Sequence, residues 1–366
     1  MIDKGVYASR LENLRKELGD ENLDGTVIVP GPNMQYFTGV DSLLLERPFM
    51  LLVPASGEAQ LVAPTLEAGP YRSSPMHMGI HQWTDSEGSP GAIRSTVRSA
   101  RVRGRWGVEG KVPFLFLHKL MKYASPKLED AEPILQKLRE RKDEAEVRLL
   151  KKSAKILSKS FSEFPDIVKE GASELSLAKA ATEIIYTNGA TKVDDMLVQS
   201  GWRAADPHCL PSSKKVRKGE SIIFDVGSTF EGYYADMTRT FCVGKSKEVQ
   251  DVYEKVLEAE EVGISAAAHG VKVGDVDEAS RGVLRKAGLG KYFIHRTGHG
   301  LGLEVHEAPY IIEGGKEKLE PNMCFTVEPG VYMRGKLGVR MEDNVLIEGK
   351  KGVEITNAPK KFGWWN

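Results

Sequence analysis

The sequence predicts a mixed α/β (α+β) protein built from two domains. Its 366 residues exceed what one hydrophobic core ordinarily holds. Residues 26–130 alternate short apolar runs with turns and helical pieces, whereas the chain after Pro133 opens with a long charged segment whose apolar residues recur at helical spacing. We therefore expect a first domain at 1–135 and a second at 136–366.

Both domains carry signals for individual elements. In the first, an N-terminal amphipathic helix capped by Ser9 is expected to carry Leu11, Leu14 and Leu18 on one face. In the second, helices are expected where a capping residue precedes an apolar period that ends at Gly or Asn. These helices span 173–186, 246–268 and 275–287, and strand-like runs lie at 195–199, 221–227, 233–243, 323–332 and 338–348.

Charge and cysteine content exclude several classes of protein. Lys+Arg and Asp+Glu both number 51, so the formal net charge is zero, whereas a nucleic-acid or membrane binder needs a basic excess. Cys209, Cys242 and Cys324 are too few and too far apart for a disulfide framework. No apolar run is long enough to span a bilayer. We expect a soluble cytoplasmic protein with no nucleic-acid or membrane partner.

The stretch 224–238, FDVGSTFEGYYADMT, reads as a hairpin with a carboxylate in each arm. Asp225 and Asp236 lie opposite each other if the turn is centred between Phe230 and Glu231. Like charges facing across a sheet destabilise it, and a cation between them would remove that cost. From this stretch alone, a metal site and a pair of surface aspartates are equally good interpretations.

A second hairpin repeats the arrangement. In 324–347, a turn centred on Gly335 places Glu328 opposite Glu342. Four carboxylates carry more negative charge than one divalent ion neutralises, so the pattern favours two ions about 3.5–4 Å apart. Ligation by oxygen favours hard or borderline ions over a structural zinc site of the thiolate type.

Histidines cluster in the segment HRTGHGLGLEVHEAP at 295–309. His299 stands between glycines, which favour extended backbone and close approach of ligands, so we predict it as a fifth ligand. A histidine ligand favours manganese, cobalt, iron or zinc over calcium or magnesium. His306 lies on the opposite face of an extended strand, so the chain must bend for both to reach one site. His208 lies between two prolines just before the first hairpin.

These motifs resemble the pita-bread metallopeptidases, the group of prolidase, aminopeptidase P and methionine aminopeptidase. Ligand type, order and spacing match over residues 150–366, and Pro32-Asn33 with the segment 36–39 is similar to the N-terminal domain of the prolidase and creatinase branch. The resemblance implies a creatinase-like N-terminal domain. It also implies a C-terminal pita-bread fold with a curved, mainly antiparallel sheet flanked by helices.

The same resemblance implies the roles of the metal ligands. Asp225 would bind one ion, and Asp236 and Glu342 would bridge both. His299 and Glu328 would bind the other ion, and a hydroxide that bridges the two metals would be the nucleophile, with Glu328 also shuttling protons.

Four further residues match positions on the substrate side of the family. His208 and His306 would hold the substrate and stabilise the tetrahedral intermediate. His295 and Arg340 would bind substrate, with Arg340 near its carboxylate.

The implied function is metal-dependent hydrolysis of Xaa-Pro bonds, by an Xaa-Pro dipeptidase (prolidase) in preference to an aminopeptidase P acting on longer peptides. The cofactors would be two divalent ions, with manganese the first choice, cobalt the second, and zinc or iron next. The resemblance also implies a homodimer. Cys209 and Val193 depart from the residues common in prolidases and could alter the substrate preference.

Two alternatives share the fold. A metal-free hydrolase of the creatinase kind would have replaced acidic ligands, yet all five predicted ligands are present. A non-catalytic pita-bread binding protein would have lost ligands and would often carry charged tails, and this chain shows neither feature.

Overall fold

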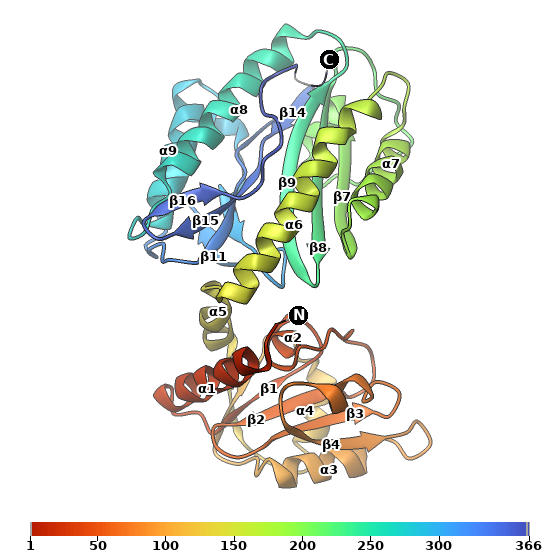
Figure 1. Cartoon of the computed structure of the whole chain (residues 1–366), viewed down its shortest axis with the longest axis vertical. Coiled ribbons are helices and arrows are strands. Elements are labelled where there is room, and N and C mark those ends of the chain that lie inside the picture. Colours follow the sequence, from red (N-terminus) through yellow and green to blue (C-terminus); the bar gives the residue numbers. More distant parts are fainter. Residues whose placement is uncertain (1, 364, 366) are drawn as a thin grey trace. The chain divides into compact units, whose positions relative to one another are not determined.

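The chain folds into two compact units. The computed structural model describes residues 2–363 and 365. Contacts divide the chain after Arg139, giving the units Met1–Arg139 and Glu140–Asn366 (Figure 1). Each unit combines helices with a sheet, so the mixed α/β class predicted from the sequence is confirmed. None of the described helices is long and apolar enough to cross a membrane.

The first unit is built on a six-stranded mixed sheet with the order β4-β3-β2-β1-β5-β6. Its strands are β1 (Gly25–Ile28), β2 (Met50–Pro54), β3 (Ala59–Pro64), β4 (Met78–Trp83), β5 (Arg105–Val108) and β6 (Lys127–Asp130). Its helices are α1 (Lys4–Asp20), α2 (Pro32–Thr38), α3 (Pro90–Ser99), α4 (Phe114–Leu120) and α5 (Glu132–Glu140).

The start of α1 corrects the sequence prediction. The N-cap is Asp3, whose carboxylate accepts the Gly5 N–H at 2.8 Å. Ser9 lies inside the helix and its hydroxyl donates to the Gly5 carbonyl, so Ser9 does not cap the helix. An N-cap side chain lies just before the helix and accepts from the free N–H groups of the first turn, and Asp3 has this position because the helix begins at Lys4. Leu14 and Leu18 are buried.

The second unit contains antiparallel strands in three groups. They are a sheet of β7 (Lys192–Ser200), β8 (Ser221–Phe230) and β9 (Tyr233–Cys242); a sheet with the order β11 (Glu307–Ile311), β10 (Gly298–Gly300), β12 (Cys324–Val327), β15 (Asp343–Glu348) and β16 (Lys351–Glu354); and the hairpin of β13 (Gly330–Met333) and β14 (Leu337–Arg340). An antiparallel bridge between Thr238 and Glu342 joins β9 to the link between β14 and β15.

Helices cover these strands. They are α6 (Glu144–Glu163), α7 (Glu174–Thr187), α8 (Lys247–Ala266) and α9 (Val273–Lys286). Helix α6 runs along β8 and β9, while α8 and α9 pack together (Figure 1). Phe224 and Val226 of β8 are buried with Leu157 and Phe161 of α6. Because side chains alternate along a strand, Asp225 points to the opposite face of the sheet.

The first hairpin has a different register from the predicted one. A two-residue turn at Glu231-Gly232, with φ of 50° and 86°, closes it, so Phe230 pairs with Tyr233 and Asp225 pairs with Thr238. Asp236 pairs with Gly227. The predicted direct pairing of Asp225 with Asp236 is therefore wrong. Positive φ at both turn positions suits a tight hairpin turn, and the two aspartates become diagonal neighbours on one face.

The predicted register about Gly335 is confirmed. Val327 pairs with Asp343 and Gly330 pairs with Arg340, and residue 335 is the midpoint of both pairs. Glu328 and Glu342 share that midpoint at the break between the two ladders. Glu328 and Glu342 therefore both lie in the short gap between the β12–β15 ladder and the β13–β14 hairpin.

Candidate metal centre

Three predicted ligands from separate segments converge in the second unit. Asp236 of β9, His299 of β10 and Glu342, which precedes β15, are all buried, and one ligand atom of each lies within 4.8 Å of the others. His299 Nε2 is 3.9 Å from Asp236 Oδ2 and 3.3 Å from Glu328 Oε1. Glu328 therefore belongs to the same cluster.

The carboxylates of this cluster repel one another. Burial, reinforced by the charge of Asp225 and opposed by Arg340, raises the pKa of Glu328 to about 8. Burial, together with the charges of Asp236 and Glu328, raises the pKa of Glu342 well above its usual range. Burial lowers the pKa of His299 well below its usual value, which keeps the imidazole neutral and able to coordinate. Oxygen donors that repel each other and a neutral imidazole fit divalent cations, whose charge would offset the repulsion.

Asp225 reaches the cluster through an ion pair with Arg340, between Arg340 Nη2 and Asp225 Oδ2. The same guanidinium donates to the Tyr332 hydroxyl at 2.7 Å and to Thr238 Oγ1 at 3.2 Å. Arg340 is buried, and its donors are directed at protein groups. Arg340 therefore pairs with Asp225, whereas the family resemblance implies that Arg340 lies near a substrate carboxylate.

Two of the predicted histidines lie against the cluster. The rings of His306 and His299 are 4.1 Å apart in an edge-to-face arrangement, and a register shift between His299 and Gly300 supplies the bend that both histidines require. His295 accepts or donates a hydrogen bond to the Tyr332 hydroxyl at 2.9 Å, and its Nδ1 lies 4.0 Å from Glu328 Oε2. Burial, followed by the charge of Arg340, lowers the pKa of His295 to about 3.

His208 occupies a more open position. Its side chain is exposed in the loop after Gly201–Ala205. Its charge contributes to the lowered pKa of His295, so it lies on the His295 side of the cluster.

Sequence reasoning missed four polar residues around the cluster: Thr238, Thr326, Tyr332 and Asn344. The Thr238 hydroxyl donates to Glu342 Oε2 at 2.7 Å, and the Tyr332 hydroxyl joins His295 to Arg340. Thr238 had a signal in the sequence, because it lies two residues after Asp236 and therefore on the same face of the strand. Thr326 had the same signal, because it lies two residues before Glu328 and donates to Glu328 Oε1. Tyr332 and Asn344 gain their partners through tertiary packing.

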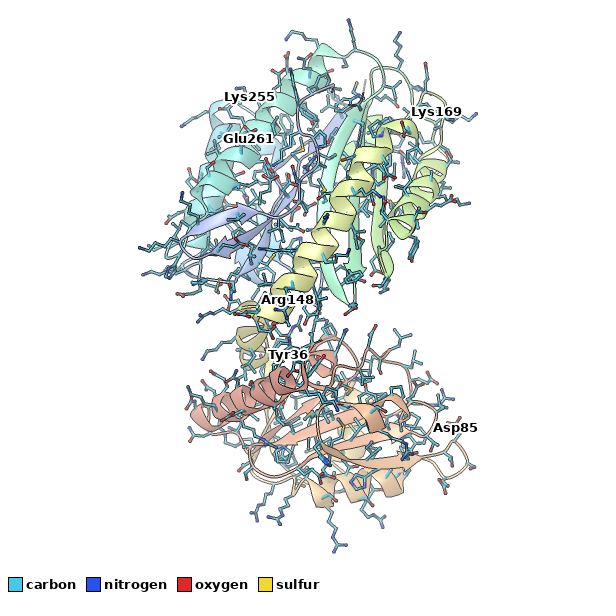
Figure 2. All side chains as sticks on the ribbon, in the orientation of Figure 1. Tyr36, Asp85, Arg148, Lys169, Lys255 and Glu261 are labelled. Carbon is cyan, nitrogen blue, oxygen red and sulfur yellow. The ribbon has the colours of Figure 1, made fainter. Side chains whose placement is uncertain are left out.

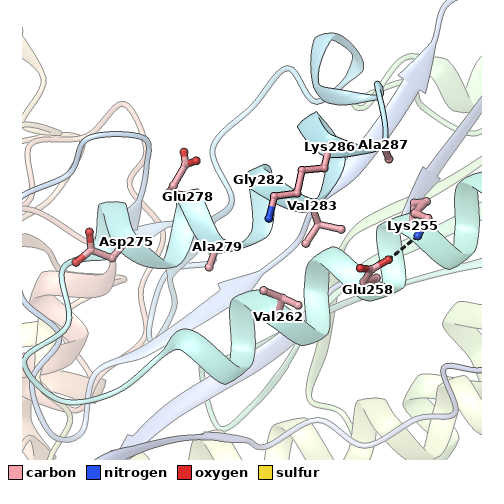
Figure 3. A pocket seen from close by; sticks show the side chains of 10 residues that line it. All are labelled: Lys255, Glu258, Val262, Asp275, Glu278, Ala279, Gly282, Val283, Lys286 and Ala287. Atoms are coloured by element: carbon pink, nitrogen blue, oxygen red, sulfur yellow. Dashed lines mark hydrogen bonds and ion pairs between the residues drawn. The ribbon is translucent and has the colours of Figure 1, made fainter.

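A separate surface groove of 830 Å³ lies between α8 and α9 (Figure 3). Lys255 and Glu258 on its wall form an ion pair of 2.7 Å, and Asp275, Glu278 and Lys286 also line it. None of the predicted site residues lines this groove. The candidate site is thus the buried cluster.

The chain belongs to metallopeptidase family M24, whose family model matches residues 148–349. A model of the creatinase/prolidase N-terminal domain matches residues 10–141. The resemblance to the pita-bread metallopeptidases is therefore confirmed, and the chain is an M24 family peptidase with the two-domain architecture that the sequence predicted.

Relatives match along nearly the whole chain. A probable dipeptidase PepE from Mycobacterium bovis is 34% identical over 366 residues, which cover 99% of this chain and 97% of the relative. The crystal structure of a prolidase from Thermococcus sibiricus has a TM-score of 0.93, with 37% identity and 99% of each chain covered. An X-Pro aminopeptidase from Thermotoga maritima has a TM-score of 0.85 at 28% identity, covering 96% of this chain and 98% of that one.

Proposed function

We propose that this protein is a dinuclear-metal-dependent peptidase that hydrolyses Xaa-Pro bonds, with dipeptides as its preferred substrates. The observation that carries the proposal is the buried convergence of Asp236, His299 and Glu342 with Glu328 alongside. Membership of a metallopeptidase family and likeness to a prolidase support it.

Five side chains would hold two divalent ions: Asp225, Asp236, His299, Glu328 and Glu342. Manganese is our first choice, ahead of cobalt, zinc and iron, because oxygen donors dominate and one imidazole is present. When bound, the ions would polarise the scissile carbonyl and lower the pKa of a water molecule.

Side chains around the ions would transfer protons and contact the substrate. Glu328, whose Oε1 lies 3.3 Å from His299 Nε2, would accept a proton from water and return it to the leaving nitrogen. His306 and His208 would donate hydrogen bonds to the oxygen of the tetrahedral intermediate. His295, which Tyr332 holds in place, would contact the substrate from its neutral form.

Arg296 supports the preference for dipeptides. Among the described residues it has no carboxylate partner, and its guanidinium lies 4.6 Å from the centre of the Tyr310 ring. Tyr310 is directly opposite His299 in the β10–β11 ladder, so both side chains lie on one face. The charge of Arg296 lowers the pKa of both His299 and Glu328. This unpaired cation next to the cluster would bind the C-terminal carboxylate that a dipeptide places close to its scissile bond.

The test is a length series assayed with added manganese or cobalt. We expect Xaa-Pro dipeptides to be cleaved faster than Xaa-Pro-Xaa tripeptides, and dipeptides faster than their C-terminal amides. Failure to cleave any Xaa-Pro bond in the presence of metal would refute the proposal. Faster cleavage of the longer peptides would instead support an aminopeptidase, the second candidate, which the likeness to the Thermotoga maritima structure favours.

The role of Arg296 has its own test. Arg296→Ala is expected to raise KM for the dipeptide about tenfold, as expected when a charged contact worth about 1.4 kcal/mol is lost, and to leave the amide unaffected. Lys291→Ala is the matched control, because Lys291 also stacks on a tyrosine nearby, at 5.0 Å from the Tyr292 ring. Equal losses on the dipeptide and its amide would contradict this role.

We also propose that the protein acts in the cytoplasm and assembles as a homodimer, as the family resemblance implies. Sedimentation velocity of the purified chain tests the assembly. A single species at the mass of one chain, 40.4 kDa, would contradict it.

A further inference from the structure

One cross-strand pair of polar residues lies directly behind the candidate metal centre. Thr326 of β12 and Asn344 of β15 are register partners in the antiparallel ladder, and both are fully buried. Opposed residues share a face of the sheet and lie about 5 Å apart. Neither belongs to the predicted ligand set, yet their hydrogen bonds reach three of its members.

Asn344 holds the backbone of Asp236 from both sides. Its Oδ1 accepts the Asp236 N–H at 3.1 Å, and its Nδ2 donates to the Asp236 carbonyl at 2.6 Å. An amide side chain offers both an acceptor and a donor in one plane, so it can satisfy both groups, whereas an ionised carboxylate has no donor for the Asp236 carbonyl. Asn344 therefore fixes the position of Asp236 on the neighbouring strand β9.

Thr326 links the other two residues. Its hydroxyl oxygen accepts the backbone N–H of His299 at 3.1 Å and its proton is directed to Glu328 Oε1 at 3.4 Å. One side chain thus orients an imidazole ligand from β10 and a carboxylate that follows β12.

We infer that Thr326 and Asn344 are positioning residues that hold Asp236, His299 and Glu328 at fixed separations before any ion binds. The inference rests on the proposed metal site. Carboxylates that repel one another would move apart in the metal-free protein, and bringing them back would reduce the affinity for the ion. Bonds to the rigid β12–β15 ladder prevent that movement, as outer partners of metal ligands generally do.

The test is a calorimetric titration of manganese chloride into the full-length protein stripped of metal. Thr326→Val keeps the shape and removes the hydroxyl, and it is expected to weaken manganese binding about tenfold, the lower end of the range for outer partners of ligands. Thr326→Ser keeps the hydroxyl and should bind within about twofold of wild type, a small change on the scale of that same range. Asn344→Ala removes both bonds to Asp236 and should weaken binding by a larger factor.

Thr96→Val is the matched control, because Thr96 is a buried threonine of the first unit whose hydroxyl bonds only within its helix, to the Ala92 carbonyl. It should bind manganese as wild type does. If Thr326→Val also binds as wild type does while folded by circular dichroism, the inference is overturned, even where Asn344→Ala fails to fold. If wild type itself takes up no manganese, cobalt, zinc or iron, the proposed function fails instead.

Discussion

Two buried groups of acidic residues lie next to each other in the second unit, and they differ in how their charge is balanced. Glu342 belongs to the candidate metal centre, and the following residue, Asp343, belongs to a second group with Glu260 and Glu354. In this second group too, one ligand atom of each residue lies within 4.8 Å of the others. Spacing alone therefore does not separate the two groups.

Two protein cations pair with the three carboxylates of the second group. Lys360 Nζ is 2.8 Å from Asp343, 2.7 Å from Glu260 and 2.8 Å from Glu354, and Arg239 Nη2 is 2.9 Å from Asp343 Oδ2. Burial alone would raise the pKa of Asp343, but Arg239 and Lys360 outweigh it and hold the pKa below its usual value. Burial, reinforced by the charge of Asp343, still raises the pKa of Glu260 and of Glu354.

Helix α8 buries one of its charged residues and exposes others. Lys255 and Glu261 project outward from this helix (Figure 2), whereas Glu260 is buried. Its carboxylate thus turns inward to meet Lys360.

The candidate metal centre has fewer Arg or Lys ion pairs for more carboxylates among the described residues. Arg340 pairs with Asp225, while burial and mutual repulsion raise the pKa of Glu328 and Glu342. A cluster of buried carboxylates thus indicates a metal site when some of its members, here Glu328 and Glu342, lack an Arg or Lys partner in the part of the chain that the structure describes. Where Arg and Lys pair with each carboxylate, the cluster is part of the folded framework.

The largest expected effect comes from Asp236→Asn. The change removes a predicted bridging ligand, so activity should fall by more than about a hundredfold, beyond the range for losing an outer partner. The metal-free variant should be at least as stable as metal-free wild type, because one member of a repelling set is gone. Peptidase assays and urea unfolding measure the two effects, and a variant with full activity and metal content would show that Asp236 is not a ligand.

Lys360→Met should lower stability and leave metal binding unchanged. The change leaves Glu260 and Glu354 without their Lys360 ion pair. Asp343 keeps Arg239, and the free energy of unfolding should fall by about 3 kcal/mol. The lower end of that range applies because the Lys360 side chain is 17% exposed. Metal content per folded chain should stay that of wild type. Loss of metal without loss of stability would assign the second group to metal binding.

The smallest effect concerns Glu140 and Glu317, a carboxylate pair outside both groups. Burial and Glu317 raise the pKa of Glu140 from 4.5 to about 8. The folded protein therefore holds this proton more tightly than the unfolded chain. The contribution of Glu140 to the free energy of unfolding is greatest below pH 4.5 and is lost as the pH rises toward about 8.

Glu140→Gln should remove this pH dependence and leave the variant more stable than wild type at pH 8, by on the order of 1 kcal/mol. Urea unfolding at several pH values between 5 and 9 measures it. Parallel profiles for wild type and variant would contradict the assignment to Glu140.

The strand pairing around Gly335 could be predicted from the sequence, because the position of the turn fixes the register of the residues on both sides of it. The register of the first hairpin was missed by one residue at the turn, where Glu231 adopts positive φ and Gly232 follows it. Moving the turn by one residue shifts the pairing by two, so Asp225 faces Thr238 and both aspartates stay on one face of the sheet.

Other features could not be predicted from residue order. Asn344 bonds to Asp236 and Thr326 bonds to His299, and these four residues lie on four different strands. Likewise, Asp343 follows Glu342 directly, and only the folded positions of Arg239 and Lys360 show that these neighbours belong to groups of different character.

The most direct test of this contrast is to count the metal ions per chain by inductively coupled plasma mass spectrometry in active wild type, Asp236→Asn and Lys360→Met. The ion pairs of the second group, and their scarcity at the first, predict two ions in wild type, two in Lys360→Met and fewer than two in Asp236→Asn. Fully active protein without metal, or two ions that persist in Asp236→Asn and are lost in Lys360→Met, would contradict the account.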